Sequence, residues 1–390
     1  MHLSHLSLTN MRSFRRLEAD LQPGLHVVTG PNGSGKSNLL EAIALLATTR
    51  STRASNDADL ISWAALRDEP LPVARLNAHV EAADGPVTVE IVVGAKAAAP
   101  REVPAATRRF RVNGVARRAS DLIGRLRVVL FSADDLGIVD GAPAARRRYL
   151  DVTISQLDPV YVRALQRYQR VLQQRNSLLR RLQERRGSPG ELDFWDQELA
   201  QSGAIVLTAR ARTLAALASG AAKRYQELAP SEEPLSVCYR PALPAPLSEA
   251  TDQSPDSLAP RLLATLNELR GRDIQAGMTR IGPHRDDVAF LIGGHHAGAT
   301  ASRGQQRSAA LALRLAEVAL STERTGDPPV LLLDDVLSEL DAARRKRVLA
   351  TAYEVDQVLI TTPDPDRPAR EELPAARRYR ITGGILEPME

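Results

Sequence analysis

One short segment near the start of the chain constrains its fold more than any other. A strand-like run at residues 27–29 leads into Gly30-Pro31-Asn32-Gly33-Ser34-Gly35-Lys36-Ser37. This octapeptide fits the phosphate-loop pattern G-x-x-x-x-G-K-[ST], which needs a strand before it and a helix after it. Its glycines let the backbone curl so that N–H groups face phosphate oxygens. The sequence therefore predicts an α/β domain that binds a nucleoside triphosphate.

The side chains of this loop suit different parts of a triphosphate. Lys36 has the length and charge to reach the outer phosphates, and the Ser37 hydroxyl is a ligand that Mg²⁺ accepts. We therefore predict Lys36 as a catalytic residue and Ser37 as a metal ligand. The predicted nucleotide site contains Gly30, Pro31, Asn32, Gly33, Ser34, Gly35, Lys36, Ser37 and Asn38.

An acidic motif near the other end of the chain complements the loop. Residues 329–335 read Pro-Val-Leu-Leu-Leu-Asp-Asp, which predicts a buried parallel strand with carboxylates at its C-terminal tip. Ligands bind at that edge of open α/β sheets. We expect Asp334 to hold Mg²⁺, and Asp335 to orient or deprotonate the attacking water. The alternative is a core strand followed by a helix N-cap, where Asp is also favoured.

Composition and charge exclude several classes of protein. No apolar run reaches the length of a membrane span, and the first residues do not read as a signal peptide. The single cysteine, Cys238, excludes an intramolecular disulfide framework and a Cys-based zinc site. The net charge of +4 permits a polyanionic partner without requiring one. We therefore expect a cytoplasmic protein that has no membrane partner.

The N-terminal segment, residues 1–135, is predicted to be the first part of the nucleotide-binding domain. Strands are expected around Leu3 to Leu8 and at residues 25–29, and a helix at residues 38–46. Asp84-Gly85 and Asn113-Gly114 each separate two strand-like runs, which is a strong signal for a β-hairpin. This segment therefore combines the phosphate loop with a strand-rich lobe.

The middle segment, residues 136–265, has a helical pattern. Apolar residues three or four apart flank a turn at residues 187–190, which predicts an antiparallel helical hairpin. Residues 241–260, rich in Pro, Ser and Ala, are expected to form a loop. Residues 266–390 return to α/β patterning. We therefore predict one α/β domain with a mixed sheet, split in sequence by an inserted helical arm.

A third motif precedes a helix rich in Ala and Leu. Ser302, Gly304 and Gln305 offer a hydroxyl, a bare backbone N–H and a helix N-terminus, which together suit an anion. The alternative is an ordinary N-cap. The sequence Ser-Glu-Leu-Asp at residues 338–341 follows the acidic strand. The chain thus has, in order, a phosphate loop, an insertion, S-x-G-Q, LLLDD and S-E-L-D.

This order of motifs resembles the ATP-binding-cassette ATPases, specifically the branch with SMC, Rad50 and RecF proteins. The resemblance implies ATP as the nucleotide and a head-to-head dimer with two ATP molecules at its interface. It implies that Ser302, Gly304 and Gln305 contact the γ-phosphate held by the other copy. It also places Asp341 in the loop at the dimer seam, and Arg12 near the adenine and ribose.

Within this branch the chain resembles the RecF family along essentially its whole length. The resemblance is carried by residues 10–15, 128–136, 141–151 and 282–287, and by the short helical insertion. It implies an ATP-dependent homodimeric clamp on double-stranded and gapped DNA, with a weak, DNA-stimulated ATPase. It also implies cooperation with RecR and RecO in loading RecA, in gap repair and the SOS response.

The chain departs from the wider cassette pattern near the attacking water. Residues 361–364 hold no switch histidine, residues 128–135 hold no Mg²⁺-contacting glutamine, and Asp335 stands where transporters usually have Glu. RecF-like proteins share these features, and each implies slow hydrolysis. Two alternatives stay open, namely the ATP-binding subunit of a membrane transporter and an ATPase head attached to a nuclease.

The arginines of the middle segment allow two interpretations. Arg146, Arg147 and Arg148 either form a solvated face or contact phosphate. The arginines between residues 163 and 186 lie on the first helix of the arm, and the sequence does not separate those that face solvent from those that line a DNA groove. His284 and Arg285 either contact a ligand or support a tight turn.

Overall fold

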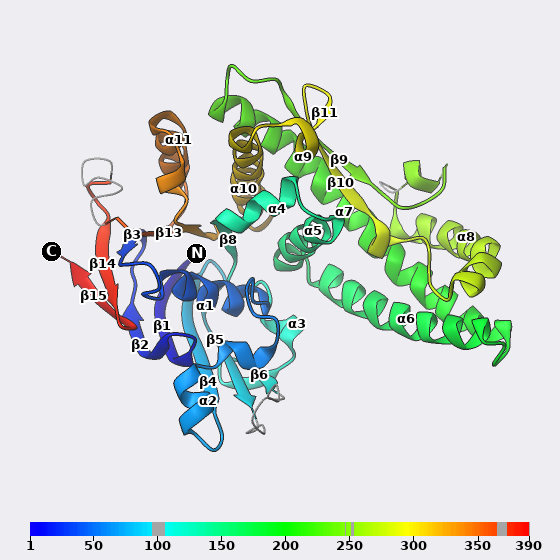
Figure 1. Cartoon of the computed structure of the whole chain (residues 1–390), viewed down its shortest axis with the longest axis horizontal. Helices are drawn as coiled ribbons and strands as arrows, with labels where there is room; N and C mark the ends of the chain where they lie inside the picture. The colour runs from blue at the N-terminus through cyan, green and yellow to red at the C-terminus, as the bar shows by residue number, and fades with distance from the viewer. Residues whose placement is uncertain (96–105, 246, 251–252, 365–372, 390) are drawn as a thin grey trace. The chain divides into compact units, whose positions relative to one another are not determined.

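Figure 1 shows the computed structural model of the chain, which describes residues 1–95, 106–245, 247–250, 253–364 and 373–389. The chain forms two compact units. The first contains Met1–Asp135, Arg224–Ser231 and Leu311–Glu390, and the second contains Leu136–Lys223 and Glu232–Ala310. The predicted α/β domain, split in sequence by an insertion, is confirmed.

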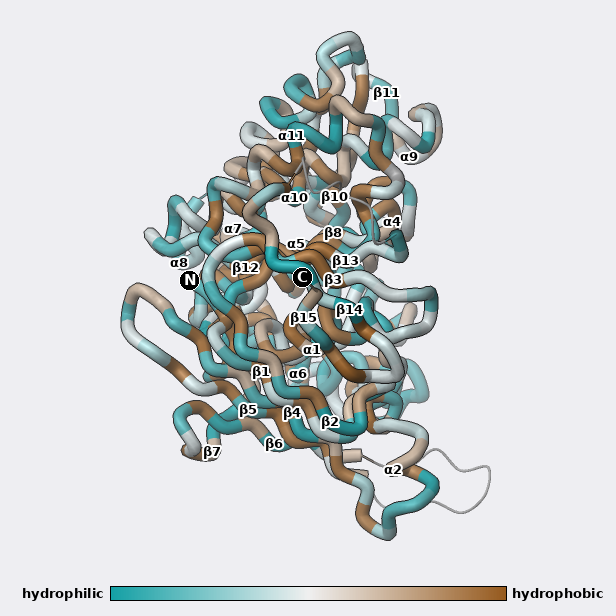
Figure 2. Tube along the Cα trace, turned by 90° about the vertical axis from the view of Figure 1, so that its left-hand side faces the viewer, coloured by the Kyte–Doolittle hydropathy of each residue, from teal (hydrophilic) through white to brown (hydrophobic). Residues whose placement is uncertain are grey.

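The first unit contains an antiparallel sheet with the strand order β2-β1-β4-β5-β6-β7 among the described residues. Both predicted hairpins are present, because β4 pairs with β5 and β6 pairs with β7. Buried residues alternate with more exposed ones along β4, as expected for a sheet with one covered face. Figure 2 colours the strands of this sheet by hydropathy. The strands are β1 His2–Met11, β2 Phe14–Asp20, β4 Val73–Ala82, β5 Gly85–Ala95, β6 Ala106–Val112 and β7 Val115–Arg117.

A second sheet in this unit has the order β15-β14-β3-β13-β12-β8. All its neighbouring strands are parallel except β14 and β15, which confirms the predicted mixed sheet. Strand β13 lies between β3, which leads into the phosphate loop, and β12, which carries the acidic motif. The strands are β3 Gly24–Thr29, β8 Val128–Ser132, β12 Val330–Asp334, β13 Gln357–Thr362, β14 Arg377–Thr382 and β15 Ile385–Met389.

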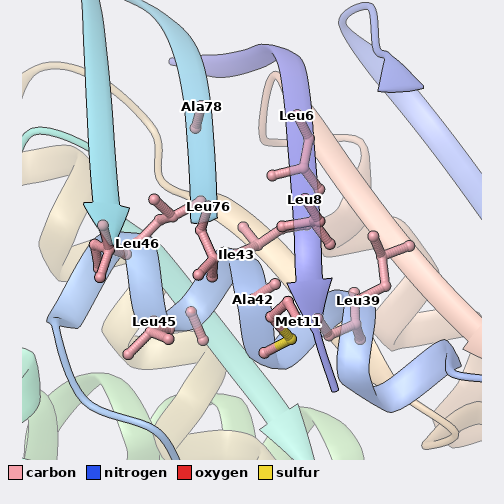
Figure 3. Packing of buried hydrophobic residues seen from close by; sticks show 14 of the residues in the cluster. Leu6, Leu8, Met11, Leu39, Ala42, Ile43, Leu45, Leu46, Leu76 and Ala78 are labelled. Atoms are coloured by element: carbon pink, nitrogen blue, oxygen red, sulfur yellow. The ribbon is translucent and has the colours of Figure 1, made fainter. Parts of the chain in front are cut away.

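Helix α1 (Lys36–Thr48) contacts both sheets. It meets β4 and β5 of the first sheet and β8, β12 and β13 of the second. Figure 3 shows Leu39, Ile43 and Leu46 of α1 among Leu8 of β1 and Leu76 of β4. A helix that is apolar on all sides is stable only when it is buried on all sides, and nearly every residue of α1 is buried. The other short helices of this unit are α2 Trp63–Asp68, α3 Ala119–Leu122 and α11 Ala342–Ala352.

The second unit contains the predicted helical hairpin, formed by α6 (Pro159–Gln183) and the first part of α7 (Leu192–Leu228). Arg175 of α6 forms an ion pair with Asp196 of α7. Arg181, six residues later on α6, pairs with Glu191, which lies five residues before Asp196 and just before α7. This order confirms that the hairpin is antiparallel. The remaining helices are α4 Leu136–Val139, α5 Pro143–Leu157, α8 Pro255–Ala276, α9 Ala297–Thr300 and α10 Arg303–Thr325, of which α10 continues into the first unit.

The second unit extends beyond the boundary expected at residue 265. Helix α8 lies beside α6, and the small sheet β9 (Leu235–Arg240), β10 (Asp287–Ile292) and β11 (His295–His296) pairs residues from both sides of that position. The unit therefore reaches Ala310. The prediction of a loop through residue 260 was wrong, because α8 begins at Pro255. Ser254 caps it by accepting the Ser257 N–H, and proline is well tolerated in a first helical turn.

A buried ion-pair network holds α6, α7 and α8 together. Arg175 of α6 is fully buried and donates to Asp196 of α7 at 2.6 Å and to Asp273 of α8 at 2.7 Å. It also donates to the Thr279 hydroxyl at 2.7 Å. Arg270 supplies a second cation for Asp196. The Arg175 guanidinium is therefore the main counter-ion of Asp273. Burial raises the pKa of the Asp273 carboxyl above its usual value, and Arg175 offsets part of that rise.

A second polar network surrounds residues 282–287. Buried Arg210 donates to Asp151 at 2.7 Å and to the Pro283 carbonyl at 2.6 Å. Arg146 binds Asp287 at 2.6 Å, and Arg147 donates to the Asp286 carbonyl at 2.6 Å. Two of the three clustered arginines therefore have intrachain partners within the second unit, which favours a structural role for them.

His284 is part of the same region, and its environment indicates a support for the turn. Its Nε2 lies 3.1 Å from the Thr279 carbonyl, which only accepts, so Nε2 carries the proton. Nδ1 then accepts from the Tyr168 hydroxyl at 2.7 Å. Burial lowers the pKa of His284 to about 4, with further lowering by nearby arginines.

We expect Arg175→Met to destabilise the second unit by about 3–5 kcal/mol, because it leaves the buried Asp273 without its main counter-ion. Urea unfolding followed through Trp195, which packs beside Leu178 and Leu192, would measure the loss. Arg180→Met, an exposed change on the same helix, is the matched control and should cost less than about 0.5 kcal/mol. Equal stability of the two variants would contradict this account.

Stability should also depend on pH through His284. Its folded pKa lies below the unfolded value near 6.5, so its contribution is complete above pH 6.5 and is lost as the pH falls towards 4. The loss amounts to about 3 kcal/mol for a shift of this size. Unfolding of wild type and His284→Gln should be measured from pH 7.5 to 4.5. The stability difference between them should shrink on acidification, and a constant difference would refute the assignment.

Candidate functional site

The phosphate loop connects the end of β3 to the start of α1. Gly35 immediately precedes α1 with φ of +111°, and a Cβ there would lie 2.6 Å from the Ser13 hydroxyl. Gly30 is equally constrained, because a Cβ there would lie 2.6 Å from the Ile381 carbonyl oxygen. Both positions therefore require glycine. The loop leads into the N-terminus of α1, where backbone N–H groups can bind an anion.

Lys36 is folded back over this loop. Its Nζ donates to the Gly30 carbonyl at 2.6 Å and to the Pro31 carbonyl at 3.0 Å. Burial lowers the pKa of Lys36, while the nearby carboxylates of Asp335 and Asp334 raise it. The ammonium thus lies between backbone carbonyls and acids, where it has the reach and charge to bind a phosphate.

The structure brings Ser37 and Asp334 together. The Ser37 hydroxyl donates to Asp334 Oδ1 at 2.9 Å, although the two residues are 297 positions apart in the chain. The Thr361 hydroxyl of β13 donates to the same oxygen at 2.7 Å. A hydroxyl and a carboxylate at this distance are oxygen ligands of the kind that Mg²⁺ prefers. The donor set therefore fits the predicted metal site.

Asp335 follows directly and has a left-handed backbone with φ of +55°. Its N–H points at both the carbonyl and the hydroxyl of Thr361, each at 3.1 Å. Its Oδ1 accepts from the Ser338 hydroxyl at 2.8 Å. This conformation is uncommon for residues other than glycine, although Asp adopts it more readily than most, and backbone of this kind is common at functional sites.

Other predicted residues of the first unit have clear intrachain contacts. Arg12 forms a two-pronged ion pair with the buried Glu41 of α1, at 2.9 and 3.1 Å. Asn38 donates to the Ser13 hydroxyl at 2.9 Å. Asp341 caps α11 by accepting the Arg344 N–H at 2.8 Å. Arg12 and Asn38 thus join the residues after β1 to α1, whereas Asp341 begins a separate helix.

The S-x-G-Q motif belongs to the second unit and caps α10. The Ser302 hydroxyl accepts the Gln305 N–H at 3.2 Å, and Gln305 Oε1 accepts the Ser302 N–H at 2.8 Å. This reciprocal pair is a capping box. Ser302 and Gly304 are exposed. The N-cap interpretation therefore holds, and it leaves an open helix N-terminus of the type that binds anions.

Sequence reasoning missed three residues that orient the predicted ones. Thr361 lies beside Asp334, Ser338 binds Asp335, and Glu41 anchors Arg12. Thr361 had no separate signal, because its place beside Asp334 is defined by the pairing of β13 with β12. Ser338 lies only three residues after its partner Asp335, so this contact is local. Glu41 could have been noticed in the sequence, because it is the one polar residue in the apolar run at residues 39–47.

Comparison with known proteins was consistent along the whole chain. The family model described as the RecF/RecN/SMC N-terminal domain matches residues 2–370. A DNA replication and repair protein RecF from Chloroflexus aurantiacus is 46% identical, covering 98% of this chain and 99% of the relative. The RecF protein of Roseiflexus castenholzii is 45% identical over the full length of both chains.

Solved structures give the same result. The recombination mediator protein RecF bound to ATP, described as part of the RecFOR pathway, aligns with a TM-score of 0.85 and 30% identity. It covers 100% of this chain and 98% of the other. An SMC head bound to a domain of ScpA aligns with a TM-score of 0.54 at 16% identity, which shows a shared fold alone.

The alternatives can now be weighed against these matches. They give no support to a transporter subunit. As a separate finding, no helix among the described residues is long and apolar enough to cross a membrane. The match covers the second unit as well as the first, so the helical insertion is part of the shared architecture. The chain therefore belongs to the RecF family of DNA replication and repair proteins.

Proposed function

We propose that this chain is an ATP-dependent clamp on DNA that hydrolyses ATP slowly. The observation that carries the proposal is the pairing of Ser37 with Asp334 at the start of the helix that follows the phosphate loop, where Lys36 also lies. A RecF protein of known structure, similar over its whole length, is described as bound to ATP. ATP and Mg²⁺ are therefore the cofactors that we assign to this site.

Each residue of the site has a role in this proposal. Lys36 exchanges the Gly30 and Pro31 carbonyls for phosphate oxygens, and the loop N–H groups bind the remaining oxygens. Ser37 and Asp334 hold Mg²⁺, which neutralises charge on the phosphates. Asp335 orients the attacking water or accepts its proton. Arg12 lies near the adenine and ribose, as the family resemblance implies, and Asn38 belongs to the nucleotide site.

The second half of each site comes from another copy of the chain. Ser302, Gly304 and Gln305 present an exposed helix N-terminus, which we assign to the γ-phosphate held by the partner copy. Asp341 lies at the dimer seam in this arrangement. ATP binding then closes the homodimer around double-stranded or gapped DNA, and slow, DNA-stimulated hydrolysis reopens it.

The biological partners follow from the family. Its members are described as DNA replication and repair proteins, and the neighbours of known structure are placed in the RecFOR pathway. We propose that this chain acts with RecR and RecO to load RecA at gaps, in the cytoplasm and during the SOS response. The domain assignment by function that we propose is two ATPase segments, residues 1–135 and 266–390, around an inserted helical arm, residues 136–265.

A mixing experiment tests the dimer. Lys36→Ala removes the phosphate contact, and Ser302→Arg blocks the S-x-G-Q motif, so each variant alone should fail to dimerise with ATP. A heterodimer of the two variants has one intact site, with the phosphate loop of the Ser302→Arg copy and the S-x-G-Q motif of the Lys36→Ala copy. Sedimentation with ATP should therefore show partial recovery of the dimer and of retention on duplex DNA. Failure of the mixture, with both variants folded, would disprove the shared site.

Thr361 should act as a positioning residue for Asp334. Thr361→Val keeps the shape of the side chain but removes its hydrogen bond, whereas Thr361→Ser keeps the bond. Loss of such a supporting bond typically weakens metal affinity by about 10–100-fold. The Mg²⁺ concentration for half-maximal ATP-dependent dimerisation should rise by that factor in the valine variant and return towards wild type in the serine variant. An unchanged Mg²⁺ dependence in the valine variant would exclude this role.

A further inference from the structure

Helix α6 differs in charge from the other long helices of the second unit. Its 25 residues include six arginines and no aspartate or glutamate. Helix α8, which lies beside it, carries acids at Asp256, Glu268 and Asp273. A solvated helix face normally mixes both signs of charge along its length. The sequence of α6 therefore differs from that expected of a helix whose exposed face contacts only solvent.

The structure sorts these arginines into two groups. Arg175 is buried in the ion-pair network, Arg167 pairs with Glu198, and Arg181 lies 3.5 Å from Glu191. Arg163, Arg170 and Arg180 are exposed, and within the part of the chain that is described they have no carboxylate partner. These three guanidinium groups are the uncompensated positive charges of the helix.

Two of the three are already oriented by their own helix. Arg170 Nε donates to the Gln166 carbonyl at 3.4 Å, and Arg180 Nε donates to the Asn176 carbonyl at 3.2 Å. These contacts use one nitrogen of each guanidinium and leave the terminal nitrogens for an external acceptor. A terminal guanidinium edge suits the paired oxygens of a phosphate group.

The three arginines lie along one exposed side of α6. Arg163 and Arg170 are two helical turns apart on one face, about 10 Å along the axis. Arg180 lies about 15 Å further along the axis and is turned by roughly 80° around the helix from Arg170. Four exposed glutamines lie between them, namely Gln166, Gln169, Gln173 and Gln174. The opposite face is held by buried side chains, including Tyr161 and Tyr168. Packing of this buried face holds α6 in place, so its exposed arginines have fixed positions along the helix.

We propose that this α6 stripe, namely Arg163, Arg170 and Arg180 with the four intervening exposed glutamines, binds the sugar–phosphate backbone of duplex DNA. The proposal rests on the DNA-binding function proposed above and identifies the surface that performs it. Single strands are usually held by stacking on exposed aromatic side chains. Both tyrosines of α6 are buried, so the stripe offers charge without stacking and suits a duplex read independently of sequence.

The test is the salt dependence of duplex binding by the triple variant Arg163→Gln, Arg170→Gln and Arg180→Gln. Glutamine retains helix propensity and removes the charge. Loss of three phosphate contacts should flatten the slope of log K against log salt by about 2 to 3. The control variant, Arg109→Gln, Arg117→Gln and Arg118→Gln, removes the same charge from an exposed hairpin of the first unit. It should retain the wild-type slope.

Two further measurements keep the outcomes separate. ATP-dependent dimerisation without DNA should be equal in wild type and the α6 variant, and thermal unfolding should confirm that both are folded. A wild-type slope in the folded α6 variant, an equal loss in the hairpin control, or a loss confined to single-stranded DNA would each overturn the assignment to α6. Absence of duplex binding by the wild type itself would overturn the proposed function.

Discussion

The burial of α1 between two sheets is the constraint on which the rest of the first unit depends. The sequence of α1 is apolar around its whole circumference, so it folds only where β4 and β5 cover one side and β8, β12 and β13 cover the other. Its N-terminus is then fixed at the edge of the second sheet where β3 and β12 end. The phosphate loop and the acidic motif meet there because β3 and β12 both pair in parallel with β13 and end at the same edge of the sheet.

Strand β13 fixes the positions of the acidic side chains relative to the phosphate loop. It lies between β3 and β12, and its register places Thr361 beside Asp334 on one neighbour and Val28 on the other. One hydroxyl thus donates to the first acid and accepts from the backbone of the second. The left-handed conformation of Asp335 is maintained by these bonds and by Ser338. The sheet, and not the loop alone, determines the orientation of the carboxylates.

The sequence was sufficient where local pattern and motif agree. The phosphate loop, β3, α1, β12, both hairpins and the antiparallel arm helices follow from short-range periodicity and turn chemistry. Local reasoning failed where distant residues decide the structure. Strands β9 to β11 pair residues on either side of α8, so the insertion reaches Ala310 and not residue 265. The start of α8 was missed because proline-rich composition suggested a loop, although Ser254 and Pro255 together form a helix start.

The same distinction applies to the arm arginines, which looked equivalent in the sequence. Arg175 and Arg180 are both on α6, yet one is fully buried between carboxylates and the other is exposed. A buried arginine needs a fixed acid from a neighbouring helix, and α7 and α8 supply Asp196 and Asp273. Helix α6 carries no acid of its own, and no ion pair joins Arg163, Arg170 or Arg180 to a carboxylate in the described part of the chain. The acids that stabilise the arm thus lie on α7 and α8, and the exposed face of α6 stays positive.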